Sequence, residues 1–341
     1  MAEAILNRMP WAGSNENPER LLTREWLVTN GLGGYASGSI AGVATRRYHG
    51  LLIAALPTPI GRTVMLSHLG EWVRLPDRRT IRLAGEERPD SAFELPDILT
   101  EFRLEMGLPV WTYHVGDAKI EKRILLPYGQ NTVHVNYRMS GAGSGVRLVL
   151  RPRLHFRGHE QPVDEGYEDA FRLHVLGPRF EVHSESHPHL PPLRLALLGR
   201  EAQLVLEGGN FEEYFYRVEA ARGYPSRGRV WTPGRFRVEL SPGEECTLVA
   251  STESWDTIHA LDPHQALKAE HARRERLIEQ ADPAARTGRA AELVLAADQF
   301  IIAPFSRQAD AARAQAVGDQ ARTVVAGYHW FTDWGPDTMI S

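Results

Sequence analysis

Residues 133–139 read Val-His-Val-Asn-Tyr-Arg-Met, so that apolar side chains alternate with polar ones. Successive side chains of a β-strand point to opposite faces, and a period of two therefore predicts a strand with one buried face. Similar alternation occurs at residues 102–106, 146–150, 171–175, 193–197 and 236–240. Glycine- and proline-containing turns separate these runs. Many half-buried strands at short spacing predict an antiparallel β-sandwich between about residues 24 and 252.

Helical signals replace this alternation near residue 256. Asp262-Pro263 is a typical N-cap followed by proline at the first helical position, and it predicts a helix to about Ala281. A second helix is expected between Pro283 and Pro304. Its apolar face is expected to comprise Ala290, Leu293, Val294, Ala297, Phe300 and Ile301. We expect a mobile loop at residues 306–320, which are rich in Ala, Gln, Asp and Arg.

The composition excludes several classes of protein. The net charge of −4 over 341 residues provides no basic field for nucleic acid. No apolar run approaches the ~20 residues of a membrane-spanning helix. Cys246 is the only cysteine, and residues 1–7 lack the basic and apolar regions of a signal peptide. We therefore expect a cytoplasmic protein without nucleic-acid or membrane partners.

The glycine-rich segment at residues 30–36, Asn-Gly-Leu-Gly-Gly-Tyr-Ala, matches a dinucleotide-binding spacing. The following helix and the acidic residue that such a site needs are both missing, because no Asp or Glu occurs between Trp26 and Gly70. A tight loop with close backbone approach is the better interpretation. The polar motif that follows, Arg46-Arg47-Tyr48-His49, lies in the same carboxylate-free stretch. It is either a solvated strand edge or a loop that reaches a polar substrate or an adjoining domain.

Clustered histidines and a pair of acids are further candidate sites. His183, His187 and His189 cluster in sequence, and His155 with His159 is a second group, but neither has regular metal-ligand spacing, so no metal is expected. Asp333 and Asp337 stand among the aromatic residues Trp330, Phe331 and Trp334. Either Asp333 or Gly335 caps a helix that begins at Pro336, or the aromatic faces hold a sugar ring whose hydroxyl groups the carboxylates bind.

Four separated blocks resemble the bacterial and archaeal glycogen-debranching enzymes, the amylo-α-1,6-glucosidase family. The blocks are residues 30–38, 45–52, 297–300 and 326–335. The resemblance implies an N-terminal β-sandwich, a helical linker and a C-terminal (α/α)6 barrel that hydrolyses α-1,6-linked glucose stubs with two carboxylates and no cofactor. We accordingly expect a sandwich domain at residues 1–255, a linker at 256–287 and an incomplete barrel domain at 288–341.

The resemblance also implies roles for particular residues. Asp337 matches an active-site aspartate of the family and is the candidate catalytic residue, whereas Pro336 stands where the family has arginine. Candidate substrate-binding residues are Trp330, Asp333, Trp334, Arg46, Arg47, Tyr48 and His49. The expected ligand is a branched α-glucan, glycogen or limit dextrin, and the expected partner is the catalytic barrel of the same full-length chain. The second carboxylate is expected beyond Ser341, so this chain alone is expected to be inactive. The alternative is a stand-alone, non-catalytic glycan-binding or assembly module.

Overall fold

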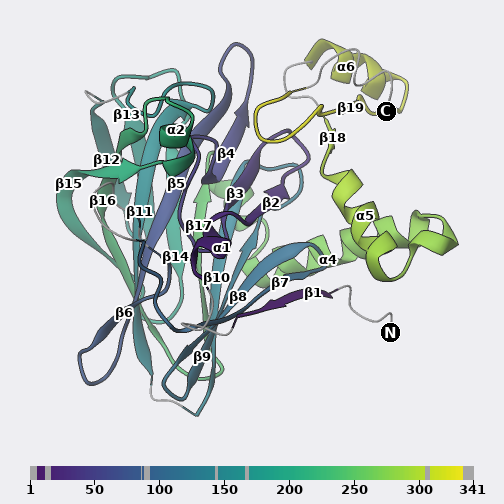
Figure 1. Ribbon diagram of the computed structural model, residues 1–341. Coiled ribbons are helices and arrows are strands. Elements are labelled where there is room, and N and C mark those ends of the chain that lie inside the picture. Colours follow the sequence, from purple (N-terminus) through teal and green to yellow (C-terminus); the bar gives the residue numbers. More distant parts are fainter. Residues whose placement is uncertain are drawn as a thin grey trace.

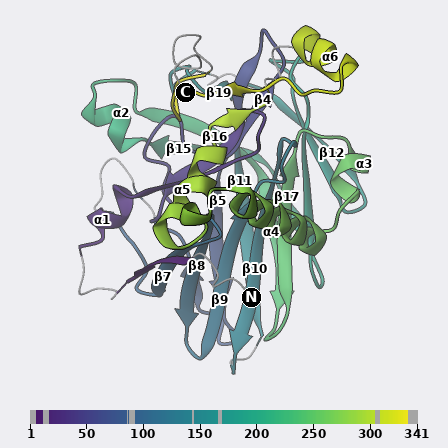
Figure 2. The ribbon, with the colours of Figure 1, turned by 90° about the vertical axis from the view of Figure 1, so that its right-hand side faces the viewer.

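A computed structural model of the chain describes residues 6–11, 17–85, 87, 93–142, 145–165, 169–303 and 308–332. Two large antiparallel sheets face each other, and the C-terminal helices lie along one side of them (Figures 1 and 2). The mainly β sandwich predicted from the alternating runs is therefore confirmed. No helix among the described residues is long and apolar enough to cross a membrane.

The first sheet has nine strands, and the 133–139 stretch lies at its centre. In spatial order it contains β1 (Leu6–Pro10), β7 (Leu99–Glu105), β8 (Leu108–Val115), β9 (Ala118–Leu125), β10 (Thr132–Gly141), β17 (Glu245–Ser251), β14 (Leu193–Leu198), β13 (Arg179–Ser184) and β12 (Phe171–Leu176). In β10, Val133, Val135, Tyr137 and Met139 are fully buried, as the period of two predicts. Strand β10 pairs with β9 on one side and β17 on the other.

The second sheet carries the strands nearest to the candidate site. In spatial order it contains β15 (Gln203–Phe215), β16 (Arg227–Leu240), β11 (Val146–Gly158), β5 (Gly61–Arg74), β4 (Gly50–Leu56), β3 (Tyr35–Ser39) and β2 (Glu25–Thr29), while β6 (Thr80–Arg82) pairs with β5. Every residue of β3 and β4 is buried. Strands buried on both faces cannot show alternation, and for this reason the periodic signal is weak in this region of the sequence.

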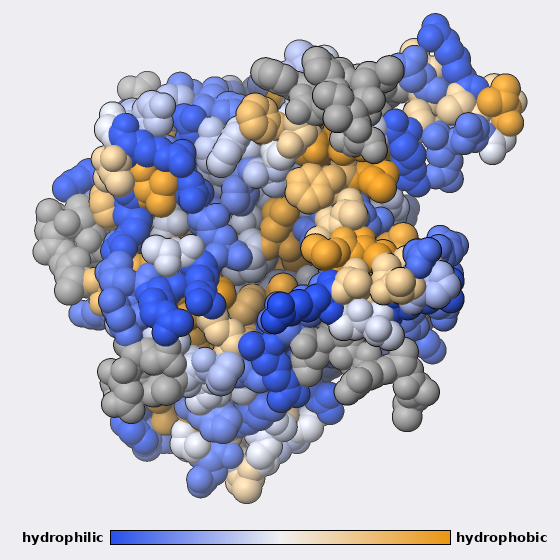
Figure 3. Space-filling model, turned by 45° about the vertical axis from the view of Figure 1, so that its right-hand side comes forward, coloured by the Kyte–Doolittle hydropathy of each residue, from blue (hydrophilic) through white to orange (hydrophobic). Residues whose placement is uncertain are grey.

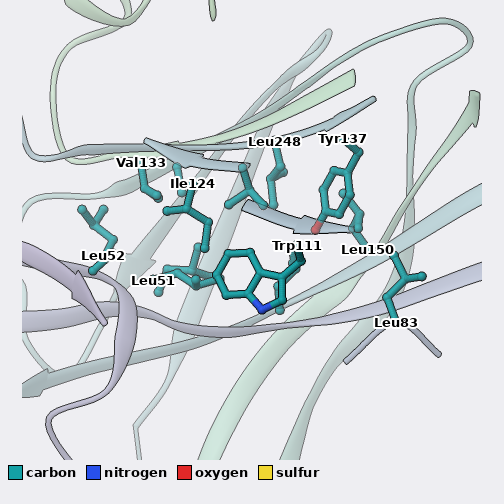
Figure 4. Close-up of a cluster of buried hydrophobic side chains, with 14 of the residues drawn as sticks. Leu51, Leu52, Leu83, Trp111, Ile124, Val133, Tyr137, Leu150 and Leu248 are labelled. Atoms are coloured by element: carbon teal, nitrogen blue, oxygen red, sulfur yellow. The ribbon is translucent and has the colours of Figure 1, made fainter. Parts of the chain in front are cut away.

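The core lies between the two sheets and is mainly apolar. Figure 4 shows Trp111 of β8 among leucine, isoleucine and valine side chains, and its indole N–H donates to the carbonyl of Ile40 at 2.8 Å. One buried ion pair joins the sheets, because Lys122 Nζ on β9 lies 2.8 Å from Glu71 on β5. Tyr137 donates its hydroxyl to the same carboxylate. The two charges thus compensate each other where water is excluded.

Helices occupy the chain ends and the connections. They are α1 (Glu19–Leu22), α2 (Arg217–Ala221), α3 (Trp255–His259), α4 (Pro263–Gln280), η2 (Pro283–Ala285), α5 (Gly288–Asp298) and α6 (Gln308–Ala316), and a two-stranded ribbon pairs β18 (Ile301–Ile302) with β19 (Thr323–Val324). The first predicted helix is confirmed as α4. Its Asp262 side chain accepts from the N–H of Gln265, and the Gln265 side chain accepts in return from Asp262 N–H in a capping box.

Two expectations for the following segment are wrong. The second helix ends at Asp298, before the ribbon, and it buries Ala291 and Leu295 while Leu293 is 69% exposed. Tertiary packing determines which face of α5 is buried, because Leu295 lies beside Gly107 in the β7–β8 turn. The loop expected at 306–320 contains the helix α6, since a segment rich in Ala, Gln and Arg has high helix propensity.

Candidate functional site

The motif at residues 46–49 forms the turn that leads into β4. The backbone N–H of His49 donates to the carbonyl of Arg46 at 3.0 Å, which closes the turn. The backbone N–H of Thr45 donates to His49 Nδ1 at 3.1 Å. Tyr48 and His49 are 5% and 1% exposed. The turn is therefore a fixed structure that faces the protein interior.

Carboxylates from distant elements compensate both arginines. Arg46 Nε lies 2.5 Å from Glu25 on β2. The Arg47 guanidinium lies 3.9 Å from Glu160 and 4.0 Å from Glu219. Both arginines are therefore paired with carboxylates from within the β-domain. The nearby sequence lacks carboxylates, but folding supplies them from β2, α2 and the loop after β11.

The segment at residues 328–331 docks directly on this turn. His329 Nε2 lies 2.7 Å from Ser37 Oγ on β3. The His329 ring also contacts the His49 ring, with 5.5 Å between centroids. Trp330 follows, and its ring centroid lies 5.9 Å from that of Tyr48. The structure thus brings together three of the sequence-predicted site residues, Tyr48, His49 and Trp330, from opposite ends of the chain.

A carboxylate that sequence reasoning missed completes this surface. Tyr48 donates its hydroxyl to Glu160 Oε2 at 2.9 Å and accepts from Arg47 Nη2 at 2.7 Å. The Glu160 side chain is 52% exposed and Trp330 is 40% exposed. We call Arg47, Tyr48, Glu160 and Trp330 the Tyr48 surface. Because Tyr48 itself is buried, the exposed indole of Trp330 is the face that can stack on a sugar ring, while the Glu160 carboxylate can accept hydrogen bonds from the sugar hydroxyl groups.

Burial and neighbouring charges shift the acid–base groups of the site. Burial raises the pKa of Tyr48, and the Glu160 carboxylate acts in the same direction. Burial lowers the pKa of His329 to about 3 and also lowers that of His49. Burial alone would raise the pKa of Glu25, but His49 and Arg46 outweigh it and hold the value at about 2. At neutral pH the site therefore contains neutral imidazoles beside an ionised, paired carboxylate.

Two groups among the described residues have the spacing of metal ligands. Glu25, His49 and His329 form the first. Because the Thr45 N–H occupies His49 Nδ1, the neutral His49 ring carries its proton on Nε2, 3.4 Å from Glu25, and cannot offer that atom to a metal. This arrangement fits a hydrogen-bonded cluster.

The second group is His174, Glu181 and His183 on β12 and β13. Glu181 Oε1 accepts from Arg194 Nε at 2.9 Å and from Trp255 Nε1 at 2.6 Å. An arginine thus already balances the charge of this carboxylate, which weakens any attraction for a cation. Of the two histidine groups weighed from the sequence, only His183 belongs to such a cluster.

The remaining candidate residues, Asp333, Trp334 and Asp337, lie outside the described residues, as does Pro336. Beside the segment that precedes them is an open groove of 1490 Å³ between α5 and strands β2 and β7. Trp26, Leu104, Leu293 and Phe300 are among its lining residues. Figure 3 shows apolar side chains gathered in the hollow between the sandwich and the helical segment. Residues of β1 at the start of the chain and residues of α5 both line this groove.

Comparison with known proteins defines the class of this fold and site. Residues 24–247 match the family described as glycogen debranching enzyme N terminal, and residues 295–341 match the family described as amylo-alpha-1,6-glucosidase. The first match spans well over half of the chain. The chain therefore belongs to the glycogen-debranching enzyme family, and the resemblance of its four sequence blocks is confirmed.

Among curated proteins no sequence matches the chain at a significant level. One similar solved structure is a bacterial glucoamylase complexed with acarbose, with 10% identity, a TM-score of 0.31, and coverage of 88% of this chain and 41% of the other. Another is a polysaccharide lyase, with 14% identity, a TM-score of 0.29, and coverage of 76% and 34%. The chain thus spans less than half of the length of either structure.

Proposed function

We propose that this chain forms the N-terminal part of a cytoplasmic glycogen-debranching enzyme that hydrolyses α-1,6-glucosidic branch points of glycogen or limit dextrin. Membership in the debranching-enzyme family supports this function. We assign residues 1–255 to a sandwich domain, 256–287 to a helical linker and 288–341 to the beginning of an (α/α)6 barrel. The buried single cysteine, Cys246, is compatible with a reducing compartment.

The observation that carries the proposal is the contact between Tyr48 and Trp330. Tyr48 belongs to the segment matched by the N-terminal family, and Trp330 to the segment matched by the glucosidase family. Glu160 holds Tyr48 from the other side and remains half exposed. The contact therefore joins aromatic and carboxylate groups of the kind that bind sugars at the junction of the two family segments.

Within this proposal Asp337 is the active-site carboxylate, and Asp333 and Trp334 contact the terminal glucose together with Trp330 and the 46–49 turn. Hydrolysis of a glycoside by this route needs a second carboxylate, about 6.5–9.5 Å from the first when the anomeric configuration is inverted. The barrel of the full-length chain would supply it. With only Asp337 assigned here, residues 1–341 are expected to release no glucose from limit dextrin.

Calorimetric titration of the 341-residue chain with maltotetraose tests the binding part of this proposal. Saturable binding is expected, and Trp330→Ala should weaken it at least tenfold, because stacking on the indole would be lost. Trp72→Ala, which removes a half-buried tryptophan on β5, is the matched control and should bind as the parent does. Equal affinity in both variants would contradict the assignment of Trp330. Binding with no hydrolysis by a chain that carries the complete barrel would favour the glycan-binding alternative.

A further inference from the structure

Arg62, the second residue of β5, binds two separate segments near the Tyr48 surface. Its Nε donates to the carbonyl of Gly33 at 2.8 Å. Its Nη1 donates to the carbonyls of His329 at 3.0 Å and Phe331 at 2.7 Å. The side chain is only 7% exposed. A single guanidinium thus binds the glycine-rich loop and both flanks of Trp330.

The surroundings of Arg62 suit a fixed orientation of this side chain. Its Cζ lies 4.9 Å from the ring centroid of Tyr328 and 5.6 Å from that of Tyr35. No carboxylate among the described residues pairs with it, so in this part of the chain its known acceptors are backbone carbonyls. Burial of a cation carries a desolvation cost, and the hydrogen bonds to three carbonyls offset part of that cost for Arg62. The guanidinium can make these bonds together because its donors lie in one rigid plane. Lysine could reproduce the charge but not the geometry.

The glycine-rich loop provides the other anchor of this contact. Gly33 has a φ of +95°, which an L side chain rarely adopts, and an added Cβ would lie 3.3 Å from Ile302 Cδ1. The backbone N–H of Ala303 donates to the carbonyl of Gly31 at 2.8 Å. The loop is therefore shaped to receive β18 on one side and Arg62 on the other. These contacts account for glycine at position 33.

We propose that Arg62 is a positioning residue, supplied by the β-sandwich, that fixes the backbone at residues 329–331 and thereby orients Trp330 for the substrate. The inference rests on the proposed function, since that function gives Trp330 its role in glucan binding. Two carbonyls, one on each side of Trp330, are bound by the same Nη1 atom. The orientation of Trp330 therefore depends on Arg62, although the two side chains need not touch.

The test uses the 341-residue chain labelled with 5-fluorotryptophan. Its eight tryptophans give separate fluorine resonances, and Trp330→Phe assigns the one that belongs to Trp330. In Arg62→Met this resonance should move most of the way to its position in the urea-unfolded chain, whereas Arg62→Lys should move it only part of the way. The amides of Ala326 and Phe331 should exchange with solvent about tenfold faster or more in Arg62→Met. Without the Arg62 hydrogen bonds, residues 326–332 can open locally while the rest of the chain stays folded.

Arg274→Met is the matched control. Arg274 is also buried, and it donates to the carbonyl of Met106 in the β7–β8 turn and to the Glu270 carboxylate on its own helix. The control should leave the Trp330 resonance unchanged. An unmoved Trp330 resonance in Arg62→Met would overturn the proposal. If Arg62→Met unfolds, Arg62→Lys decides: movement of Trp330 alone supports positioning, and movement of all resonances or of none overturns it.

A sugar titration of the same labelled chain distinguishes failure of the positioning role from failure of the proposed glucan binding. Addition of maltotetraose to the parent chain should shift the Trp330 resonance if Trp330 binds glucan. A sugar-induced shift with no effect of Arg62→Met would support glucan binding and overturn the positioning role. An effect of Arg62→Met without any sugar-induced shift would support positioning and count against glucan binding.

Discussion

Ser37 Oγ and His329 Nε2 lie 2.7 Å apart, although 292 residues separate them in the sequence. Ser37 donates its own proton to the carbonyl of Trp26 at 2.7 Å, so its oxygen accepts from His329. Neutral His329 therefore carries its proton on Nε2. Burial lowers the pKa of this imidazole to about 3, which keeps it neutral over a wide range of pH.

This contact leads to a prediction about acid stability. An unfolded imidazole takes up a proton below about pH 6.5, whereas folded His329 does so only near pH 3. Between these values the unfolded state binds more protons, so the free energy of unfolding falls as the pH falls. His329 contributes a slope of up to about 1.4 kcal/mol per pH unit. Urea denaturation of His329→Gln at pH 7.5 and 5 should show a smaller pH dependence than the parent, and exposed His189→Gln is the control. An unaltered slope in His329→Gln would contradict the assignment.

A second prediction concerns the charge network of the turn. Arg47→Ala removes the donor to Tyr48 and one partner of the buried Glu219 carboxylate. Loss of such contacts should lower the free energy of unfolding by about 1–3 kcal/mol. The half-exposed pair of Arg147 with Glu239 provides the control, because Arg147→Ala should cost no more than about 1 kcal/mol. Equal losses in the two variants would mean that the Arg47 network adds nothing beyond a surface ion pair.

Limited trypsin digestion tests the domain boundaries. The sandwich has paired strands and a continuous core, whereas residues 282–322 contain short elements and exposed arginines such as Arg289 and Arg313. We therefore expect the first cleavage within 282–322 and a resistant fragment that retains residues 24–252. Mass spectrometry of the early products identifies the site. A first cut inside β10 or β17 would show that the sandwich is not an autonomous unit.

The sequence predicts those parts of the fold that local patterns determine. The alternation at residues 133–139 and the N-cap with proline at Asp262-Pro263 each specify one element, and both form as expected. The exposed position of Leu293 could not be predicted, because the turn at Gly107 selects the face of α5 through tertiary packing. Local sequence determines the period of an element, but its partners determine which face is buried.

The candidate site was predictable only where its residues form a motif. Tyr48 and His49 stand in such a motif, and aromatic neighbours mark Trp330. Glu160 and Arg62 lie singly in otherwise ordinary strands and loops, and only the fold places them beside these residues. The acids that compensate Arg46 and Arg47 come from equally distant positions. A carboxylate-free stretch of sequence therefore does not indicate free charge in the folded chain.

A fourth prediction follows from the resemblance, which implies that Pro336 stands where the family has arginine. Proline at 336 offers no side-chain donor, whereas arginine can donate several hydrogen bonds in a fixed plane. Pro336→Arg, tested in this chain fused to the remaining barrel of a close family member, should raise kcat/KM on α-1,6-linked stubs. One charge-assisted hydrogen bond is worth roughly 1.5–3 kcal/mol, which corresponds to a gain on the order of tenfold to a hundredfold. An unchanged rate would show that the arginine is dispensable here.

The most direct test of the proposed function is the rate of glucose release from limit dextrin by the same fusion protein with Asp337→Asn. Asparagine keeps the size of the side chain but can neither exchange a proton nor carry the negative charge that glycoside hydrolysis requires. We predict that hydrolysis is abolished while maltotetraose binding and the melting temperature stay close to those of the parent fusion. Full activity in Asp337→Asn would remove Asp337 from the site and contradict the assignment of this chain to the catalytic machinery of a debranching enzyme.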